Sequence, residues 1–241
     1  MYNIDNKDEN MALIHQGKVK SVYDVKDNDD QVVIQYHDKV TAGNGRKVDF
    51  PEEKGALCCQ ISEWFFKYFD DKFLTHYISC PSPTHMLCKK VNVIPVEVIC
   101  RNIAAGSIVR NTPIAEGTVF DPPLVEFNLK DDEKDDPLLT DDRVSLMGFD
   151  PETFKRRASE VNYHLKMIFD RMGIDLVDFK LEYGHDTNGG LCLVDELSPD
   201  NMRLWKKGTK ERFDKDLFRK GEGDIVSAYR YILEQLRQMD E

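Results

Sequence analysis

Two stretches of the sequence decide its fold and chemistry: LVDFKLEYG at residues 176–184 and LCLVDELSPD at residues 191–200. In the first stretch, Asp178, Lys180 and Glu182 alternate with apolar residues. Because successive side chains of a strand point to opposite faces of a sheet, these three charges should share one face. The glycine-rich link between the two stretches predicts a hairpin.

The second stretch is an apolar run that ends at the adjacent carboxylates Asp195 and Glu196. Mg²⁺ prefers hard oxygen ligands, typically one or two carboxylates together with nucleotide phosphate oxygens. Glu182 and Asp195 would suit this role, and Lys180 could contact a phosphate or a substrate carboxylate. Charged residues on a solvated sheet face are the alternative, and the pattern alone leaves both readings open.

The composition describes an acidic globular protein of 241 residues, 41% of them hydrophobic and 32% charged. The formal net charge of -11 disfavours general binding to nucleic acid or to an anionic membrane. No apolar run reaches the roughly 18 residues that cross a bilayer, and MYNIDNKDEN at the N-terminus lacks the apolar core of a signal peptide. The six cysteines form no C-x-x-C pair, so reduced thiols and a cytoplasmic location are expected and zinc is not.

The order of the predicted elements indicates an α+β protein with two domains. β-Branched runs up to residue 36 and at residues 86–100 predict strands. Helical periodicity and capping signals predict helices at residues 53–69, 150–172 and 223–239. We expect a small β-rich, nucleotide-covering domain at residues 1–90 and a larger α+β domain at residues 91–241 that carries the metal and substrate sites.

Near the N-terminus, Gly17-Lys18-Val19-Lys20 opens a predicted hairpin that could fold over nucleotide phosphates. Lysines two residues apart lie on one strand face, and glycine permits close backbone approach. The segment is not a Walker A loop, and the chain has neither H-R-D nor D-F-G of the protein kinases. By themselves the two lysines are weak evidence, because surface Gly-Lys pairs are common.

A third candidate site is RNIAAGSIVR, residues 101–110, which follows an apolar strand. Arg101, the Ser107 hydroxyl and loop N–H groups could hold a phosphate or carboxylate, and the small residues between them leave room for a ligand. A tight turn with a structural arginine explains the segment equally well. Arg203 comes just beyond the proposed metal ligands, while Arg219 alone would be a surface charge.

Taken together and in order, these motifs resemble the SAICAR synthetase family. The motifs are GKVKSVYDV, TAGNG, PVEVICRNIAAGSIVR, DPPLVEFNLK, LVDFKLEYG, LVDELSPDNMRLW and KDLFR, and they run from Gly17 to the final helix. The resemblance implies a small antiparallel β-rich domain, a larger α+β domain and an ATP cleft between them. It also implies an ATP- and Mg²⁺-dependent ligase of purine biosynthesis, commonly a homodimer in bacteria. The family joins L-aspartate to the carboxylate of carboxyaminoimidazole ribonucleotide (CAIR), giving SAICAR, ADP and phosphate, and an acyl phosphate is the expected intermediate.

The resemblance also implies roles for single residues. It implies that Lys18 and Lys20 contact the ATP phosphates and that the backbone of Lys89 to Val91 contacts adenine. It further implies that Glu182 and Asp195 bind Mg²⁺. CAIR contacts fall to Arg101, Ser107 and Arg203, with Arg219 near the ribose phosphate. Asp178 and Lys180 line the substrate side as catalytic candidates, and Asp136 resembles a further active-site acid.

Two positions depart from the family pattern. Asn44 stands where many relatives have aspartate, and Leu217 stands where relatives often carry another arginine. Neither change removes a proposed metal ligand, so activity is still expected. A phosphotransferase on a similar scaffold and a non-catalytic nucleotide-binding module are the competing hypotheses.

Overall fold

The computed structural model describes residues 11–43 and 45–240, and these form two compact units, each assembled from separate segments of the chain. Of the described residues, the N-terminal unit contains 11–43, 45–94, 183–198 and 217–240. The central unit contains residues 95–182 and 199–216. The first division lies close to the boundary predicted after residue 90, but two later segments join the N-terminal unit. Asn44 and the first ten residues lie outside the described part of the chain.

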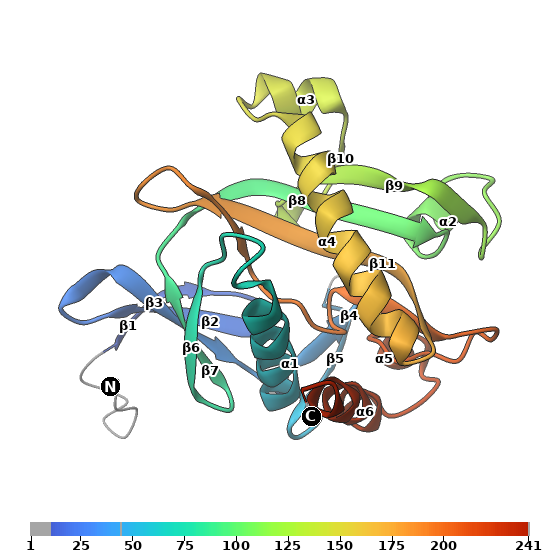
Figure 1. The fold of residues 1–241 in the computed structure, drawn as a ribbon, viewed down its shortest axis with the longest axis horizontal. Coiled ribbons are helices and arrows are strands. Elements are labelled where there is room, and N and C mark those ends of the chain that lie inside the picture. Colours follow the sequence, from blue (N-terminus) through green and yellow to red (C-terminus); the bar gives the residue numbers. More distant parts are fainter. Residues whose placement is uncertain (1–10, 44, 241) are drawn as a thin grey trace. The chain divides into compact units, whose positions relative to one another are not determined.

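The N-terminal unit is built on an antiparallel sheet with strand order β1-β2-β3-β7-β6. Its elements are β1 (Met11–Gln16), β2 (Lys20–Val25), β3 (Asn28–Tyr36), β4 (Val40–Ala42), β5 (Lys47–Asp49), α1 (Lys54–Phe69), β6 (Tyr77–Ser82), β7 (His85–Lys89), β12 (Leu191–Val194) and α6 (Ile225–Gln238). β4 and β5 form a separate small sheet (Figure 1). The predicted helices at residues 53–69 and 223–239 are therefore present as α1 and α6.

The turn between β2 and β3 is tighter than the sequence suggests. Val25 pairs with Asn28, so only two residues form the loop, and Asp27 has a φ of 61°. A two-residue hairpin loop needs left-handed conformations, which aspartate tolerates better than most residues. Asn28, Asp29 and Asp30 therefore belong to β3.

Helix α1 fits closely against the chain that follows β3. A Cβ atom at Gly55 would lie 2.8 Å from the carbonyl carbon of His37 and 2.9 Å from the carbonyl oxygen of Tyr36, so only glycine fits there. The Gly55 N–H donates to Asp38 Oδ1 over 2.9 Å, which satisfies one of the unpaired donors at the start of the helix. The buried face of the helix, including Ile61 and Phe65, contributes to the core of this unit.

The central unit has its own antiparallel sheet, in which β10, β9, β8 and β11 are neighbours and β13 pairs with β11. The elements within it are α2 (Ser107–Asn111), β9 (Val119–Leu129), a 3₁₀ turn (Asp132–Lys134), β10 (Leu138–Leu139), α3 (Asp141–Leu146), α4 (Pro151–Arg171) and β13 (Met202–Lys206). β8 (Asn92–Ile103), β11 (Ile174–His185) and α5 (Asp216–Lys220) contain the divisions between the units. Helix α4 begins as predicted, with the Asp150 side chain accepting from Glu152 N over 3.1 Å.

β9 is the longest element that the sequence patterns do not predict, because it contains Pro122 and Pro123. Proline lacks an N–H and is confined to edges of sheets. β10 pairs with β9 only at Phe127 and Asn128, so within the described part of the chain the proline end of β9 pairs only with β8. The two prolines are therefore compatible with a long strand here.

Candidate functional site

In the N-terminal unit, Lys20 lies between two carboxylates at the end of β12, a group that we call the lysine cluster (Lys20, Asp195 and Glu196). Lys20 Nζ pairs with Asp195 Oδ1 and donates to Glu196 Oε1 over 2.9 Å. The Lys20 side chain is 15% exposed and that of Glu196 is 5% exposed, so solvent screens their interaction only weakly. The predicted Lys20 and Asp195 are thus brought together across 175 residues of sequence.

Local structure places these groups and tunes their charge. Asp195 follows directly after β12 and has a φ of 68°, a left-handed conformation that few residues other than glycine adopt. Burial disfavours the charged form of Lys20, but Asp195 and Glu196 more than offset burial and raise its pKa. The Ser198 hydroxyl also donates to Glu196 Oε2 over 2.6 Å. Lys20 is therefore held as a fixed cation beside two acids.

The central unit contains an arginine cluster (Arg101, Asp178, Arg203 and Ser107). Arg101 Nη1 donates to Asp178 Oδ2 over 3.0 Å, and Arg203 Nη1 donates to both Asp178 oxygens over 3.1 and 2.9 Å. Arg101 Nη2 donates to the Ser107 hydroxyl over 2.8 Å. One buried carboxylate thus joins two arginines that come from β8 and β13, and planar guanidinium groups are well suited to carboxylate and phosphate ligands.

Two further carboxylates orient these arginines, and the sequence patterns had not singled them out. Glu126 in β9 accepts from Arg101 Nε over 2.5 Å, and Asp216 accepts from Arg203 Nε over 3.1 Å. Burial lowers the pKa of Arg203, but the charges of Asp178 and Asp216 more than offset it, so the net pKa is raised. Their signal in the sequence was weak, because isolated acidic residues are usually solvent-exposed.

Near Glu182 the central unit forms a third group, the Glu182 cluster (Lys130, Lys180, Glu182 and Glu97). Lys130 Nζ lies 2.6 Å from Glu182 Oε2, and Lys180 Nζ lies 2.6 Å from Glu182 Oε1 and 2.8 Å from Glu97 Oε1. The contact between residues 180 and 182 agrees with the predicted alternation along β11. Burial raises the pKa of Glu97, Lys180 opposes this, and Glu182 and Asp136 add to it.

Lys130 is a residue that sequence reasoning missed. It is the last residue of the DPPLVEFNLK motif, immediately after β9, and its ammonium contacts both Glu182 oxygens. A lysine that ends an extended segment carries little functional signal in a single sequence. Its pairing with a buried carboxylate is visible only in the folded chain.

The predicted magnesium ligands fit this ion by the chemistry of their donors. Glu182 and Asp195 both present carboxylate oxygens, the hard ligands that Mg²⁺ prefers, and each is paired with lysine. Within residues 11–43 and 45–240, no three or more His, Cys, Asp or Glu side chains gather as a metal cage.

Four further predicted residues lie in loops or in a short helix. Lys18 is exposed between β1 and β2, Arg219 is exposed in α5, and Val91 is half-buried after β7. Asp136 has a φ of 45° and accepts from Asp131 N over 3.0 Å, which ties it into its own loop. Leu217 packs beside Gly223, where a Cβ would lie 3.2 Å from Leu217 Cδ2.

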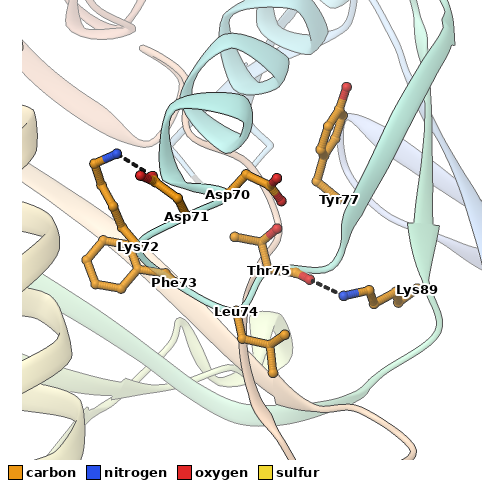
Figure 2. Close-up of a pocket in the computed structure, with 8 residues that line it drawn as sticks. All are labelled: Asp70, Asp71, Lys72, Phe73, Leu74, Thr75, Tyr77 and Lys89. Atoms are coloured by element: carbon orange, nitrogen blue, oxygen red, sulfur yellow. Dashed lines mark hydrogen bonds and ion pairs between the residues drawn. The ribbon is translucent and has the colours of Figure 1, made fainter.

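Lys89 lines a cavity of about 310 Å³ that Figure 2 shows together with its other lining residues. They are Asp70, Asp71, Lys72, Phe73, Leu74, Thr75 and Tyr77, from the end of α1, the segment that follows it and β6. Lys89 Nζ donates to the Thr75 carbonyl oxygen over 3.4 Å. Lys89 is the one predicted site residue in this cavity, so the cavity is separate from the lysine cluster.

The glycine of the RNIAAGSIVR motif differs from its expected role. The sequence suggested that the small residues leave room for a ligand beside Ser107. A Cβ at Gly106 would lie only 2.5 Å from Arg203 Nη2, so the guanidinium of Arg203 occupies this space. Ala104 and Ala105 are buried and do not face solvent.

Comparison with known proteins decides the family. A family model described as SAICAR synthetase matches residues 13–236. The chain belongs to the SAICAR synthetase family. The α+β SAICAR synthetase fold predicted from the resemblance is confirmed, as is membership of a family of purine-biosynthesis ligases.

Individual relatives agree with the family model over nearly the whole chain. Phosphoribosylaminoimidazole-succinocarboxamide synthase of Methanocaldococcus jannaschii is 45% identical over 228 residues, covering 92% of this chain and 93% of the relative. The crystal structure of the Ehrlichia chaffeensis enzyme of that name has a TM-score of 0.89 at 36% identity, covering 94% and 98% of the two chains. A SAICAR synthetase solved with ADP has a TM-score of 0.87 at 36% identity and covers 92% of this chain and 96% of its own.

No helix within residues 11–43 and 45–240 is both long enough and apolar enough to cross a bilayer.

Proposed function

We propose that this chain is a phosphoribosylaminoimidazole-succinocarboxamide synthase that joins L-aspartate to the carboxylate of CAIR and cleaves ATP to ADP and phosphate. The observation that carries the proposal is the buried Arg101 and the half-buried Arg203, which are joined by Asp178 beside Ser107. Family membership supplies the reaction, and the arginine cluster supplies a surface suited to an anionic nucleotide.

The chemistry needs ATP because a carboxylate is a poor acyl donor. In the proposed first step, the CAIR carboxylate attacks the γ-phosphorus of ATP, ADP leaves, and an acyl phosphate forms. The amine of aspartate then attacks the acyl carbon, phosphate departs with the bonding electrons, and the amine loses a proton. Positioning and charge neutralisation account for most of the catalysis in such a sequence.

On the nucleotide side, we assign Lys18 and Lys20 to the ATP phosphates and the backbone of Lys89 to Val91 to adenine. Lys20 is held charged by Asp195 and Glu196, so it can exchange a carboxylate partner for a phosphate oxygen without changing its protonation. Glu182 and Asp195 would hold Mg²⁺, which when bound neutralises phosphate charge. Lys130 and Lys180, which pair with Glu182 in this structure, would then contact anionic substrate groups.

On the substrate side, we assign Arg101, Ser107 and Arg203 to CAIR and place Arg219 near its ribose phosphate. Asp178 accepts from both arginines, so its contribution is to hold them in register rather than to carry a proton. Lys180 and Asp136 stay the remaining catalytic candidates, Lys180 as a cation for a developing negative charge.

One coupled assay tests the function. The chain is incubated with Mg²⁺-ATP and CAIR, with L-aspartate present or omitted, while ADP and SAICAR are measured together. We expect SAICAR and ADP in equal amounts only when aspartate is present. A stable phosphorylated product without amide formation would indicate a phosphotransferase, and no aspartate-dependent product at adequate enzyme concentration would reject the proposal.

Assembly and location stay predictions that follow from the family. We expect a homodimer, which light scattering coupled to size-exclusion chromatography would measure directly. We expect a cytoplasmic enzyme, and cell fractionation with an antibody against the chain would test that.

A further inference from the structure

Gly106, the residue before α2, lies against the guanidinium of Arg203 more closely than any side chain would allow. A Cβ built on Gly106 would be 2.5 Å from Arg203 Nη2, 2.6 Å from Cζ and 2.7 Å from Nη1. Carbon atoms without a bond between them prefer about 3.5–4.0 Å. Even a methyl group at residue 106 would therefore have to displace the guanidinium.

The guanidinium is held in this position from other directions by two carboxylates. Arg203 Nη1 donates to Asp178 Oδ1 and Oδ2 over 3.1 and 2.9 Å, and Arg203 Nε donates to Asp216 Oδ2 over 3.1 Å. Asp178 is itself fixed by Arg101, whose side chain is only 3% exposed. Moving the guanidinium away from residue 106 would therefore break its bonds to two buried carboxylates, which costs more than breaking exposed ion pairs.

We propose that Gly106 is a positioning residue for the substrate arginine: its missing side chain creates the space in which Arg203 lies, and Asp178 and Asp216 hold the guanidinium there. The proposal rests on the proposed function, because it takes Arg203 as a CAIR contact. Gly106 touches no reacting atom in this scheme. It acts through Arg203, whose alignment sets the geometry offered to the substrate.

A purely conformational need for glycine is the competing explanation. Gly106 has a φ of 67° and a ψ of −126°, a region that residues with a side chain rarely enter. That backbone cost does not depend on which residue occupies position 203. A contact with the guanidinium does depend on it, so the two explanations separate when residues 106 and 203 are changed together.

The experiment is a double-mutant cycle of Gly106→Ala and Arg203→Lys. The measurements are KM for CAIR, KM for ATP, kcat and the thermal midpoint. Gly173→Ala is the control, because Gly173 also lies in the central unit, has a φ of 68° and would place its Cβ more than 4 Å from any other group. With Arg203 present, we expect Gly106→Ala to lower kcat/KM for CAIR about 100-fold, the size expected for a misplacement near 1 Å. KM for ATP should stay within roughly twofold of the wild-type value, since Gly106→Ala leaves the lysine cluster intact.

With lysine at position 203, the planar group that meets residue 106 is gone, so Gly106→Ala should cost much less of the CAIR efficiency. Equal losses in both backgrounds, or a loss shared equally between CAIR and ATP, would overturn the proposal in favour of backbone strain. The thermal midpoints of the wild type, the two single variants and the double variant test the same contact without any substrate. If the wild-type chain makes no SAICAR, the proposed function fails. Non-additive midpoints would then still support the contact, and additive midpoints would reject it.

Discussion

The lysine cluster and the arginine cluster both hold cations among carboxylates, but they use different cationic side chains. Lys20 is a point charge that pairs with the adjacent carboxylates of one loop, Asp195 and Glu196. Arg101 and Arg203 are planar forks that share Asp178, with Glu126 and Asp216 on their Nε atoms. Each arginine thus donates to two carboxylates at defined angles, whereas the ammonium of Lys20 can donate to oxygens in many arrangements.

We propose that the difference reflects two kinds of ligand. An ammonium group can exchange its contacts. It therefore suits a flexible phosphate chain and a metal ion that keeps part of its water shell. A rigid nucleotide with a fixed carboxylate suits guanidinium groups that are fixed beforehand. The predictions below test whether the two clusters act on different substrates and whether they contribute unequally to stability.

The largest effect is expected from Asp195→Asn, which removes one charge from the lysine cluster and one proposed metal ligand. We expect kcat to fall about 100- to 1000-fold, as when a transition-state stabilising group is lost. The thermal midpoint should change little, because Lys20 keeps Glu196 as a partner. Steady-state rates across a Mg²⁺ titration measure this, with exposed Asp29→Asn as the charge control. Normal turnover with normal metal dependence would remove Asp195 from the ligand set.

Asp178→Asn should have the largest effect on stability. An amide cannot accept from Arg101 and Arg203 as the carboxylate does, and both arginines would lose a buried counter-charge. We expect the free energy of unfolding to fall by about 3 kcal/mol, in the range for breaking buried ion pairs. Urea unfolding measures it, with Asp175→Asn on the same strand as the control. A loss no larger than that of Asp195→Asn would show that the two clusters are equally rigid.

A pair of alanine substitutions separates the substrates. Arg203→Ala should lower kcat/KM for CAIR about 10- to 100-fold, the value of a charge-assisted hydrogen bond at about 1.5–3 kcal/mol. KM for ATP should be unchanged. Lys20→Ala should show the reverse pattern, with the loss in ATP use. If both variants lose CAIR and ATP equally, the proposed division between the clusters is wrong.

The smallest effect concerns Asp214, which accepts from Leu204 N over 2.7 Å and from Asp216 N over 2.6 Å. Burial and then the charge of Asp216 raise its pKa to about 7, against the opposing effect of the two N–H donors and of Arg203. The ordinary value is 3.8, so between about pH 4 and pH 7 the folded chain binds a proton that the unfolded chain has released. This group therefore makes the folded state less stable as pH rises through that range.

Asp214→Asn tests that linkage. The unfolding free energy of the wild type, minus that of the variant, should decrease by up to ~1.4 kcal/mol for each pH unit between the two pKa values. Chemical denaturation at several pH values measures the difference, and subtraction removes the titration of groups that both chains share. A difference that is flat or that rises with pH would show that Asp214 is ionised throughout the range.

Several features were predictable because they are local. The alternation of Asp178, Lys180 and Glu182 gave the correct face of β11, since the period of a strand is a property of its backbone. The cap at Asp150 marked the start of α4 for the same kind of reason. β9 was missed because two prolines argue against a strand, and only its place at an open edge permits them.

By itself, the sequence determined the two late strands, the principal helices, the acidic overall charge and, through its ordered motifs, the family. Periodicity and capping act within a few residues, so a single chain displays them. Only the tertiary structure decided that Lys20 meets Asp195 and Glu196, that Lys130 meets Glu182, and that one aspartate joins Arg101 to Arg203. These pairs are separated by up to 176 residues, and charge alone does not choose among many possible partners. Packing chooses them, because it fixes where each strand ends and which carboxylate each ammonium or guanidinium can reach.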